Sequence, residues 1–403
     1  MRISMFMPDL GPNALGREVH LDFAKAIEEL GHHFELLSTG SSDHCSELVG
    51  TGKILDVPAG WQRLGRLASP LFRTKSLLPS VAALAKHLKQ FGNSIDLLHV
   101  EVAYPHGAAA ALAAKVADWK GPLVITPMGE DTLVVKDAYY GFRRYPVPRV
   151  LVDWTLSRAA GLRCISPMHE EWIAGLAPQV RRRVIPLNIS LTVAAAAEES
   201  TTRKENRRRI ARELVSSDFN ISHRPIILSL GRLHPFKGLD VLIKAMASIE
   251  RAVLLIAGPS LEGKAFGNEA TRLLEIANKY GVDDRVQLLG SVSSLRSLEL
   301  LAAADVVVVP SHLESLNKVC VEAAAVGTPF IVTKTTGICA WVPDSGVGIV
   351  VPPRDPGELV SAITDVLSGH WRLDYLSATK FVGRFYPQKV AAEVVDFYQT
   401  VLG

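Results

Sequence analysis

Two glutamates eight residues apart lie in a stretch whose surroundings favour a ligand site. The stretch Pro310-Ser-His-Leu-Glu314-Ser-Leu-Asn-Lys-Val-Cys-Val-Glu322 follows the apolar run 306–309, which predicts a buried strand. It then opens a helix that we expect to close at Gly327. Ligands of open α/β sheets bind beyond the carboxyl ends of strands, where helix N-terminal amides attract anions. Glu314 is expected in the loop and Glu322 about two turns into the helix, on the same side. Both carboxylates can then accept hydrogen bonds from sugar hydroxyls; two solvated acids beside a capped helix are the alternative.

A glycine-punctuated turn earlier in the chain carries two cations. Arg232 and Lys237 lie in Gly231-Arg232-Leu-His-Pro-Phe-Lys237-Gly238, between a predicted strand, Ile226–Ser229, and a predicted helix, Leu239–Ala247. A fixed Arg and Lys beside backbone amides can hold a diphosphate and stabilise its charge as it leaves. The alternative is a solvated loop.

The elements that must position these residues are short apolar runs separated by longer segments of helical period. The predicted strands are Ile3–Met7, Phe34–Ser38, Leu97–Val100, Leu123–Thr126, Leu162–Ser166, Ile226–Ser229, Val253–Ala257, Val286–Leu288, Val306–Val309 and Phe330–Thr333. Runs this apolar are buried on both faces of a sheet, and the helices between them imply parallel βαβ units. Because the pattern occurs twice, the predicted fold class is α/β with two doubly wound, Rossmann-like domains.

The composition narrows the class of protein. The 403 residues are 48% hydrophobic and 21% charged, which excludes a disordered chain and fits two globular domains. The net charge of +3, with no basic run flanked by aromatic residues, predicts no nucleic-acid partner. The four cysteines form no CxxC pair, so we expect no metal site and a reducing compartment. No apolar window is long enough for a membrane span or a signal peptide, which predicts a cytoplasmic location.

One segment of the first half has an unusual charge pattern. Residues 57–95 contain no Asp or Glu, yet they include six Lys and Arg residues with leucines and Phe72 interleaved. Such an amphipathic element can lie on an anionic bilayer, at the inner face of a membrane. The alternative is a solvated basic face over ordinary core leucines.

The Arg–Lys turn, the paired glutamates and the Gly-Thr-Pro that follows them together resemble glycosyltransferase family 4, the glycosyl transferases group 1. The resemblance covers nearly the whole chain and implies a GT-B fold, in which two Rossmann-like domains face each other across a cleft. It implies an acceptor-binding domain over 1–188 and a nucleotide-sugar-binding domain over 189–386. A C-terminal helix, 387–403, would pack back on the first domain.

The resemblance also implies an activity. Members are retaining, metal-independent transferases that move a sugar from a nucleoside-diphosphate sugar to an acceptor hydroxyl. The donor is a substrate, so no cofactor is expected. A saccharide, lipid-linked or small-molecule acceptor in polysaccharide or glycoconjugate biosynthesis is implied. The alternatives that stay open are a non-catalytic nucleotide-sugar binder, a GT-B nucleotide-sugar epimerase and a phosphorylase.

Carried over residue by residue, the resemblance gives each candidate a role on the donor side. Arg232 and Lys237 would bind the diphosphate, Glu314 the hydroxyls of the transferred sugar, and Glu322 the ribose. The other implied donor-side contacts are the backbone amides of Leu316, Asn317 and Lys318, and Gly16 in the loop after the first strand.

Two departures from the family pattern concern the sugar and the acceptor. Asn317 stands where the family usually has Gly, and Asn tolerates left-handed backbone geometry better than most residues. Met128 stands where the family has an acceptor-side His. His106, Glu130 and Asp131 remain as candidate acceptor ligands, with helix capping or core packing as the alternative for each.

Overall fold

The computed structural model describes residues 1–7, 16–39, 52–221, 223–263, 267–342 and 346–403, the side chain of residue 137 excepted. The chain divides into two compact units. The N-terminal unit comprises Met1–Ser190 and Pro387–Gly403, and the C-terminal unit comprises Leu191–Tyr386.

Among its described residues the N-terminal unit has a seven-stranded parallel sheet in the order β3-β2-β1-β4-β5-β6-β7. The strands are β1 (Arg2–Phe6), β2 (His33–Ser38), β3 (Gly52–Ile54), β4 (Leu97–Glu101), β5 (Leu123–Thr126), β6 (Gly161–Cys164) and β7 (Arg182–Val184). The helices are α1 (Arg17–Glu29), α2 (Trp61–Phe72), α3 (Leu77–Phe91), α4 (Ala108–Ala117), α5 (Pro146–Arg158), α6 (Pro167–Leu176) and α15 (Pro387–Leu402). The strand order reverses direction between β1 and β4, which is the switch point of a doubly wound sheet.

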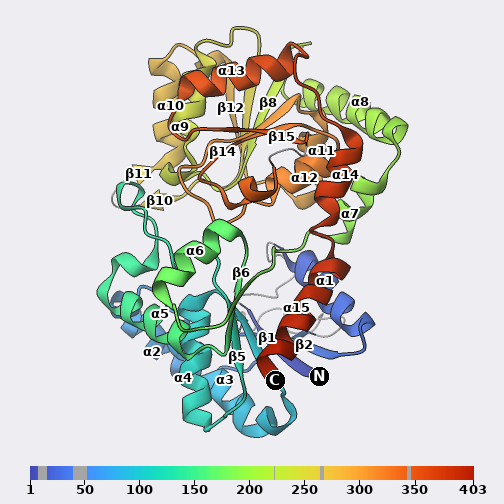
Figure 1. Cartoon of the computed structure of the whole chain (residues 1–403). Helices are drawn as coiled ribbons and strands as arrows, with labels where there is room; N and C mark the ends of the chain where they lie inside the picture. Colours follow the sequence, from blue (N-terminus) through green and yellow to red (C-terminus); the bar gives the residue numbers. More distant parts are fainter. Residues whose placement is uncertain (8–15, 40–51, 222, 264–266, 343–345) are drawn as a thin grey trace. The chain divides into compact units, whose positions relative to one another are not determined.

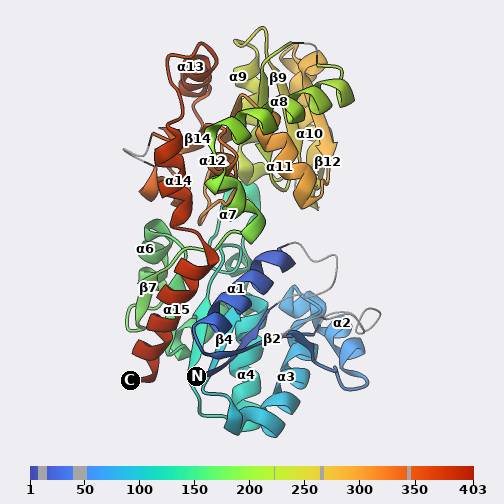
Figure 2. The same cartoon turned by 90° about the vertical axis from the view of Figure 1, so that its right-hand side faces the viewer.

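The last helix belongs to the first sheet. α15 lies beside α1 in both views (Figures 1 and 2). The phenolic oxygen of Tyr398 on α15 lies 2.5 Å from the His99 Nδ1, and the Nε2 of the same ring lies 2.7 Å from the Thr126 Oγ1. All three residues are fully buried. Burial lowers the pKa of His99, so its ring is neutral and serves as one donor and one acceptor in this chain of hydrogen bonds.

The C-terminal unit repeats the same strand order. Over its described residues the main sheet has six parallel strands in the order β12-β9-β8-β13-β14-β15. The strands are β8 (Ile226–Leu230), β9 (Val253–Ala257), β12 (Val286–Gly290), β13 (Val306–Val309), β14 (Phe330–Thr333) and β15 (Gly348–Val351), with a short hairpin of β10 (Glu262–Gly263) and β11 (Gly267–Asn268). The helices are α7 (Leu191–Glu198), α8 (Thr201–Asp218), α9 (Leu239–Met246), α10 (Glu269–Lys279), α11 (Ser294–Ala303), α12 (Val319–Ala325), α13 (Pro356–Leu367) and α14 (Tyr375–Gly383).

The predicted fold of two doubly wound parallel sheets is confirmed, and each of the ten predicted strands is present within two residues of its expected ends. Apolar patterning did not indicate the outer strands β3 and β7, of sequences Gly-Lys-Ile and Arg-Arg-Val. Outer strands are covered less than central ones, so charged side chains are tolerated there. No helix among the described residues is long and apolar enough to cross a membrane.

Candidate active site

The candidate donor site lies at the carboxyl ends of β8 and β13, the two central strands of the C-terminal unit. Two glycines let the loops after these strands approach closely. A Cβ on Gly238 would overlap the Pro310 carbonyl oxygen, and a Cβ on Gly258 would overlap the Gly231 carbonyl oxygen. Both glycines have positive φ, +66° and +147°, which non-glycine residues rarely adopt. The loops after β8, β9 and β13 therefore meet backbone to backbone.

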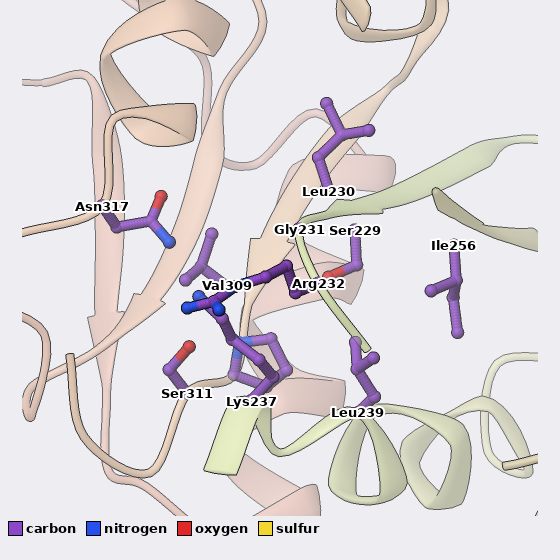
Figure 3. Close-up of a pocket in the computed structure, with 11 residues that line it drawn as sticks. Ser229, Leu230, Gly231, Arg232, Lys237, Leu239, Ile256, Val309, Ser311 and Asn317 are labelled. Atoms are coloured by element: carbon purple, nitrogen blue, oxygen red, sulfur yellow. The ribbon is translucent and has the colours of Figure 1, made fainter. Parts of the chain in front are cut away.

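Arg232 and Lys237 come from the loop after β8 and line one pocket with Ser311 and Asn317 from the loop after β13. Figure 3 shows the nitrogen atoms of both cations turned toward the same space, with the Asn317 amide facing it. Arg232 is exposed, whereas Lys237 is largely buried, with 15% of its side chain exposed. Two cations in one pocket are suited to a diphosphate.

Glu314 forms the centre of a hydrogen-bond cluster. Its Oε1 lies 2.6 Å from the Lys237 Nζ, and its Oε2 accepts hydrogen bonds from the Ser311 Oγ at 2.9 Å and the Asn317 Nδ2 at 3.0 Å. Burial alone would raise the pKa of Glu314, but Lys237, Asn317 and Ser311 outweigh it, so this pKa is lowered. The carboxylate is therefore ionised and fixed in direction.

The backbone of Glu314 is also held, by the segment that follows β14. Its N–H donates to the Thr335 carbonyl, and its own carbonyl accepts from the Gly337 N–H. The Thr333 Oγ1 donates to the Ser311 carbonyl, so these three hydrogen bonds join the two segments. Ser311 and these threonines were not predicted from the sequence. The run Thr333-Lys-Thr-Thr, which begins at the last residue of the predicted strand Phe330–Thr333, was the signal that could have indicated the threonines.

The structure corrects the expected position of Glu322. α12 begins at Val319, so Glu322 lies in its first turn rather than two turns in. Burial raises the pKa of Glu322, although Lys318 opposes the rise. Glu322 is not among the residues that line the pocket of Arg232 and Lys237. Both Glu314 and Glu322 act electrostatically on the buried Cys320 thiol, so the two carboxylates lie in the same region.

The other donor-side candidates are backbone positions. Leu316 is buried, and its carbonyl accepts from the Ile338 N–H, while Lys318 immediately precedes α12. Asn317 has φ +79°, the left-handed geometry expected of a residue standing where Gly is usual. In the N-terminal unit Gly16 precedes α1 with φ +83°, and residues 11–15 of its predicted loop lie outside the described residues.

The acceptor-side candidates have different surroundings. Asp131 is fully buried, and its carboxylate accepts hydrogen bonds from the backbone N–H groups of Ala103, Met128 and Gly129. It thus joins the loops after β4 and β5. The Met128 N–H lies within hydrogen-bond distance of both carboxylate oxygens, at 3.1 and 3.3 Å, so each oxygen already meets two backbone donors. Glu130 next to it is exposed.

His106 is buried against the Phe6 ring, with centroids 5.6 Å apart, and burial lowers the pKa of His106 to about 4. Nothing in the described part of the chain bonds to its Nδ1. His20 on α1 lies with its Nε2 3.6 Å from a Glu101 carboxylate oxygen at the end of β4.

The described residues contain no group of three or more His, Cys, Asp and Glu side chains arranged to hold a metal ion. The cationic side chains of Arg232 and Lys237 supply the positive charge of the pocket.

Solved structures share this architecture across the whole chain. Sucrose-phosphate synthase from Thermosynechococcus elongatus superposes with a TM-score of 0.78 at 21% identity, covering 100% of this chain and 99% of that one. HepE from Anabaena, in complex with UDP and glucose, gives a TM-score of 0.74 at 17% identity, covering 99% of each chain. Together with the two Rossmann-like sheets, these likenesses define a GT-B fold.

Sequence comparisons identify the family. The model described as glycosyl transferases group 1 matches residues 212–379, and the one described as glycosyl transferase 4-like domain matches residues 16–188. The chain belongs to this family of glycosyltransferases.

Curated relatives match shorter stretches. D-inositol 3-phosphate glycosyltransferase 2 of Catenulispora acidiphila is 34% identical over 184 residues, 43% of this chain and 42% of the relative. The D-inositol 3-phosphate glycosyltransferase of Mycolicibacterium vanbaalenii is 38% identical over 150 residues, 36% of this chain and 33% of the relative. The chain thus matches less than half the length of these relatives.

Proposed function

We propose that this chain is a retaining glycosyltransferase that moves a sugar from a nucleoside-diphosphate sugar to an acceptor hydroxyl. One observation carries the proposal: Arg232 and Lys237 share a pocket, and Lys237 is paired with the ionised Glu314 at 2.6 Å. The pocket thus joins two cations suited to a diphosphate with a carboxylate suited to sugar hydroxyls. HepE, which shares this fold, has been solved in complex with UDP-glucose, and this supports a donor of the same chemical class.

The residues would act as follows. The bond between the anomeric carbon and the diphosphate oxygen breaks, and Arg232 and Lys237 stabilise the negative charge that develops on the departing diphosphate. The acceptor oxygen bonds to the anomeric carbon on the same face of the sugar, and its proton passes to a phosphate oxygen. Glu314 orients the sugar through a hydroxyl, and Glu322 binds the ribose. The N-terminal unit binds the acceptor, which is a saccharide, a lipid-linked saccharide or a small polyol. The reaction belongs to polysaccharide or glycoconjugate synthesis.

A thermal-shift panel with UDP-, GDP-, ADP- and dTDP-sugars in EDTA tests the donor class. A ligand that binds only the folded state stabilises it by about 2.7 kcal/mol at one hundred times its Kd. We expect one nucleotide series to raise the melting temperature of the native chain and to have little effect on Arg232→Ala. Equal shifts for both proteins would refute a diphosphate site at Arg232.

We further propose that the N-terminal unit docks on an anionic membrane through α2, at the cytoplasmic face where nucleotide sugars are present. Gly65 forms the buried side of α2, since a Cβ there would overlap the Lys75 carbonyl oxygen. Leu64, Leu67 and Leu71 lie on the far side and are 44%, 70% and 58% exposed. At about 100° per residue they form one stripe.

The charge around this leucine stripe favours anionic lipid over a protein partner of mixed charge. Arg63 and Arg66 are exposed on the neighbouring face of α2, and no acidic residue occurs in 57–95. Apolar insertion together with basic contacts is how interfacial helices bind bilayers, with about 1 kcal/mol from each basic residue near an anionic surface.

Liposome sedimentation compares phosphatidylglycerol-containing vesicles with phosphatidylcholine vesicles. We expect native protein to bind the anionic vesicles only, and Leu67→Glu/Leu71→Glu to lose most of this binding. Leu295→Glu, at a leucine 69% exposed on α11, serves as the matched control and should bind like the native protein. Equal weak binding to both vesicle types would exclude the membrane proposal without touching the donor site.

A further inference from the structure

The side chain of Asn317 takes part in the donor site beyond shaping its loop. Its Nδ2 donates to the Glu314 Oε2 at 3.0 Å. The opposite amide orientation would place two oxygens against each other, so the bond to Glu314 fixes the rotamer. Nothing in the described part of the chain donates to the buried Asn317 Oδ1. Within the described ranges, the amide is therefore held by Glu314 alone.

The two oxygens of Glu314 differ in what they can still accept. A carboxylate oxygen offers two lone-pair positions. Oε2 already accepts from Ser311 at 2.9 Å and from Asn317 at 3.0 Å, whereas Oε1 meets, among the described residues, only the Lys237 ammonium at 2.6 Å. One lone pair therefore remains, on Oε1. With glycine at position 317, a second would be open on Oε2.

We infer that Asn317 is a specificity-determining residue of the donor-sugar subsite, because it limits Glu314 to one sugar hydroxyl. This inference rests on the proposed function. The Oε1 atom accepts that hydroxyl, while the sugar position facing Oε2 meets the Asn317 carboxamide and is not read by Glu314. The donor sugars that fit include those that lack a hydroxyl at this second position, that is, deoxy sugars as well as fully hydroxylated ones.

A series of donor analogues tests directly how many sugar hydroxyls Glu314 binds. The analogues are nucleoside-diphosphate hexoses, each lacking one ring hydroxyl, in the nucleotide series that the wild-type chain binds. A hydroxyl that donates to a carboxylate is expected to change kcat/KM by at least about tenfold when it is removed. For the wild type we expect one Glu314-dependent position of this size, identified by its loss in Glu314→Gln. For Asn317→Gly we expect a second hydroxyl position whose removal lowers kcat/KM by this factor.

The variant and its control are matched in backbone geometry. Glycine adopts the φ of +79° at position 317 without strain, so Asn317→Gly is expected to fold. Asn220→Gly makes the same substitution at another left-handed residue, φ +53°, exposed after α8. Asn220→Gly should show the same single Glu314-dependent hydroxyl position as the wild type. Unchanged affinity for the nucleoside diphosphate alone confirms that the site of Asn317→Gly is intact.

Two results separate this inference from the proposed function. Two sensitive hydroxyls in the wild type, or the same single one in Asn317→Gly, would overturn the inference while leaving the transferase intact. Turnover of no parent donor by the wild type would overturn the proposed function and the inference with it.

Discussion

Replacing Lys237 by Met removes one partner of the ion pair at the centre of the proposed donor site. The Met side chain keeps the volume and leaves the Glu314 carboxylate with hydrogen bonds from Ser311 and Asn317 only. It also removes one of the two cations proposed to stabilise the departing diphosphate. Loss of such a preorganised group typically costs about 10²- to 10³-fold in kcat. We expect donor turnover to fall by this factor.

The same substitution has a calculable effect on stability. Removing one partner of a fully buried pair costs about 3–5 kcal/mol. Lys237 and Glu314 are 15% and 17% exposed, and Oε2 stays hydrogen-bonded, so we expect about 2–3 kcal/mol at pH 7. The melting temperature of a unit of about 200 residues, such as Leu191–Tyr386, falls by about 2–4 °C for each kcal/mol of lost stability. The melting temperature should therefore fall by about 4–12 °C.

The pH dependence identifies Glu314 as the cause. In the wild type its folded pKa lies below the unfolded value of 4.5, so its stabilising contribution is present above about pH 4.5 and is lost as the pH falls through the folded pKa. Without Lys237, burial raises this pKa, and the unpaired carboxylate destabilises the fold until it is protonated. The gap between the two melting temperatures should begin to narrow as the pH falls through the raised Glu314 pKa of the variant, above 4.5, and should narrow further below about pH 4.5 as the wild type loses its own contribution.

Scanning fluorimetry from pH 4 to 8 measures this gap. Lys244→Met is the matched control, because Lys244 makes a 3.2 Å pair with Asp240 one helical turn away and is 36% exposed. Such a pair contributes about 0.2–0.5 kcal/mol, so the control should shift by about 2 °C or less. A Lys237→Met gap no larger than the control's, or one that does not change with pH, would refute the role assigned to the pair.

Three further substitutions test other parts of the site. Glu322→Gln should raise the melting temperature slightly at pH 7, since the folded pKa of this acid is raised and its ionised form destabilises the fold, while nucleoside-diphosphate affinity in calorimetry falls about tenfold. Asp131→Ala leaves three backbone N–H groups unpaired, two of them buried, and should lower stability by about 2–4 kcal/mol in urea titrations; an unchanged midpoint would contradict its loop-joining role. Gly238→Ala forces a Cβ onto the Pro310 carbonyl and should cost more than about 3 kcal/mol, whereas Gly281→Ala, at φ +64° in open space, should cost about 1–2 kcal/mol by the same measurement.

The central strands, and with them the positions of the loops after β8 and β13, were predictable because their determinants are local. Runs such as Val306–Val309 are apolar on both faces, and their lengths match the strands closely. The left-handed geometry at Asn317 agrees with the resemblance, which places Asn where the family usually has Gly, and with the tolerance of Asn for this geometry. The first residue of α12 was harder to predict, because Ser315–Lys318 contain no strong helix-breaking residue. The helix begins only after the left-handed Asn317.

Contacts between segments far apart in the chain could not be predicted from the sequence. Nothing near Asp131 indicates that its carboxylate would cap the loop after β4, 28 residues earlier. The bond from Ser311 to Glu314 depends on a loop shape fixed by Thr333 from the next strand. Such roles depend on tertiary neighbours, which residue type and spacing do not specify.

The central claim is transfer of a sugar from a nucleoside-diphosphate donor at the pocket of Arg232, Lys237 and Glu314. Proton NMR of a reaction in EDTA, with the donor series selected by thermal shift and a panel of saccharide, lipid-linked and polyol acceptors, measures it directly. We expect release of nucleoside diphosphate, a product with the anomeric configuration of the donor, and loss of this product in Arg232→Ala. Nucleotide binding without transfer to any acceptor, or an epimerised nucleotide sugar as the product, would contradict it.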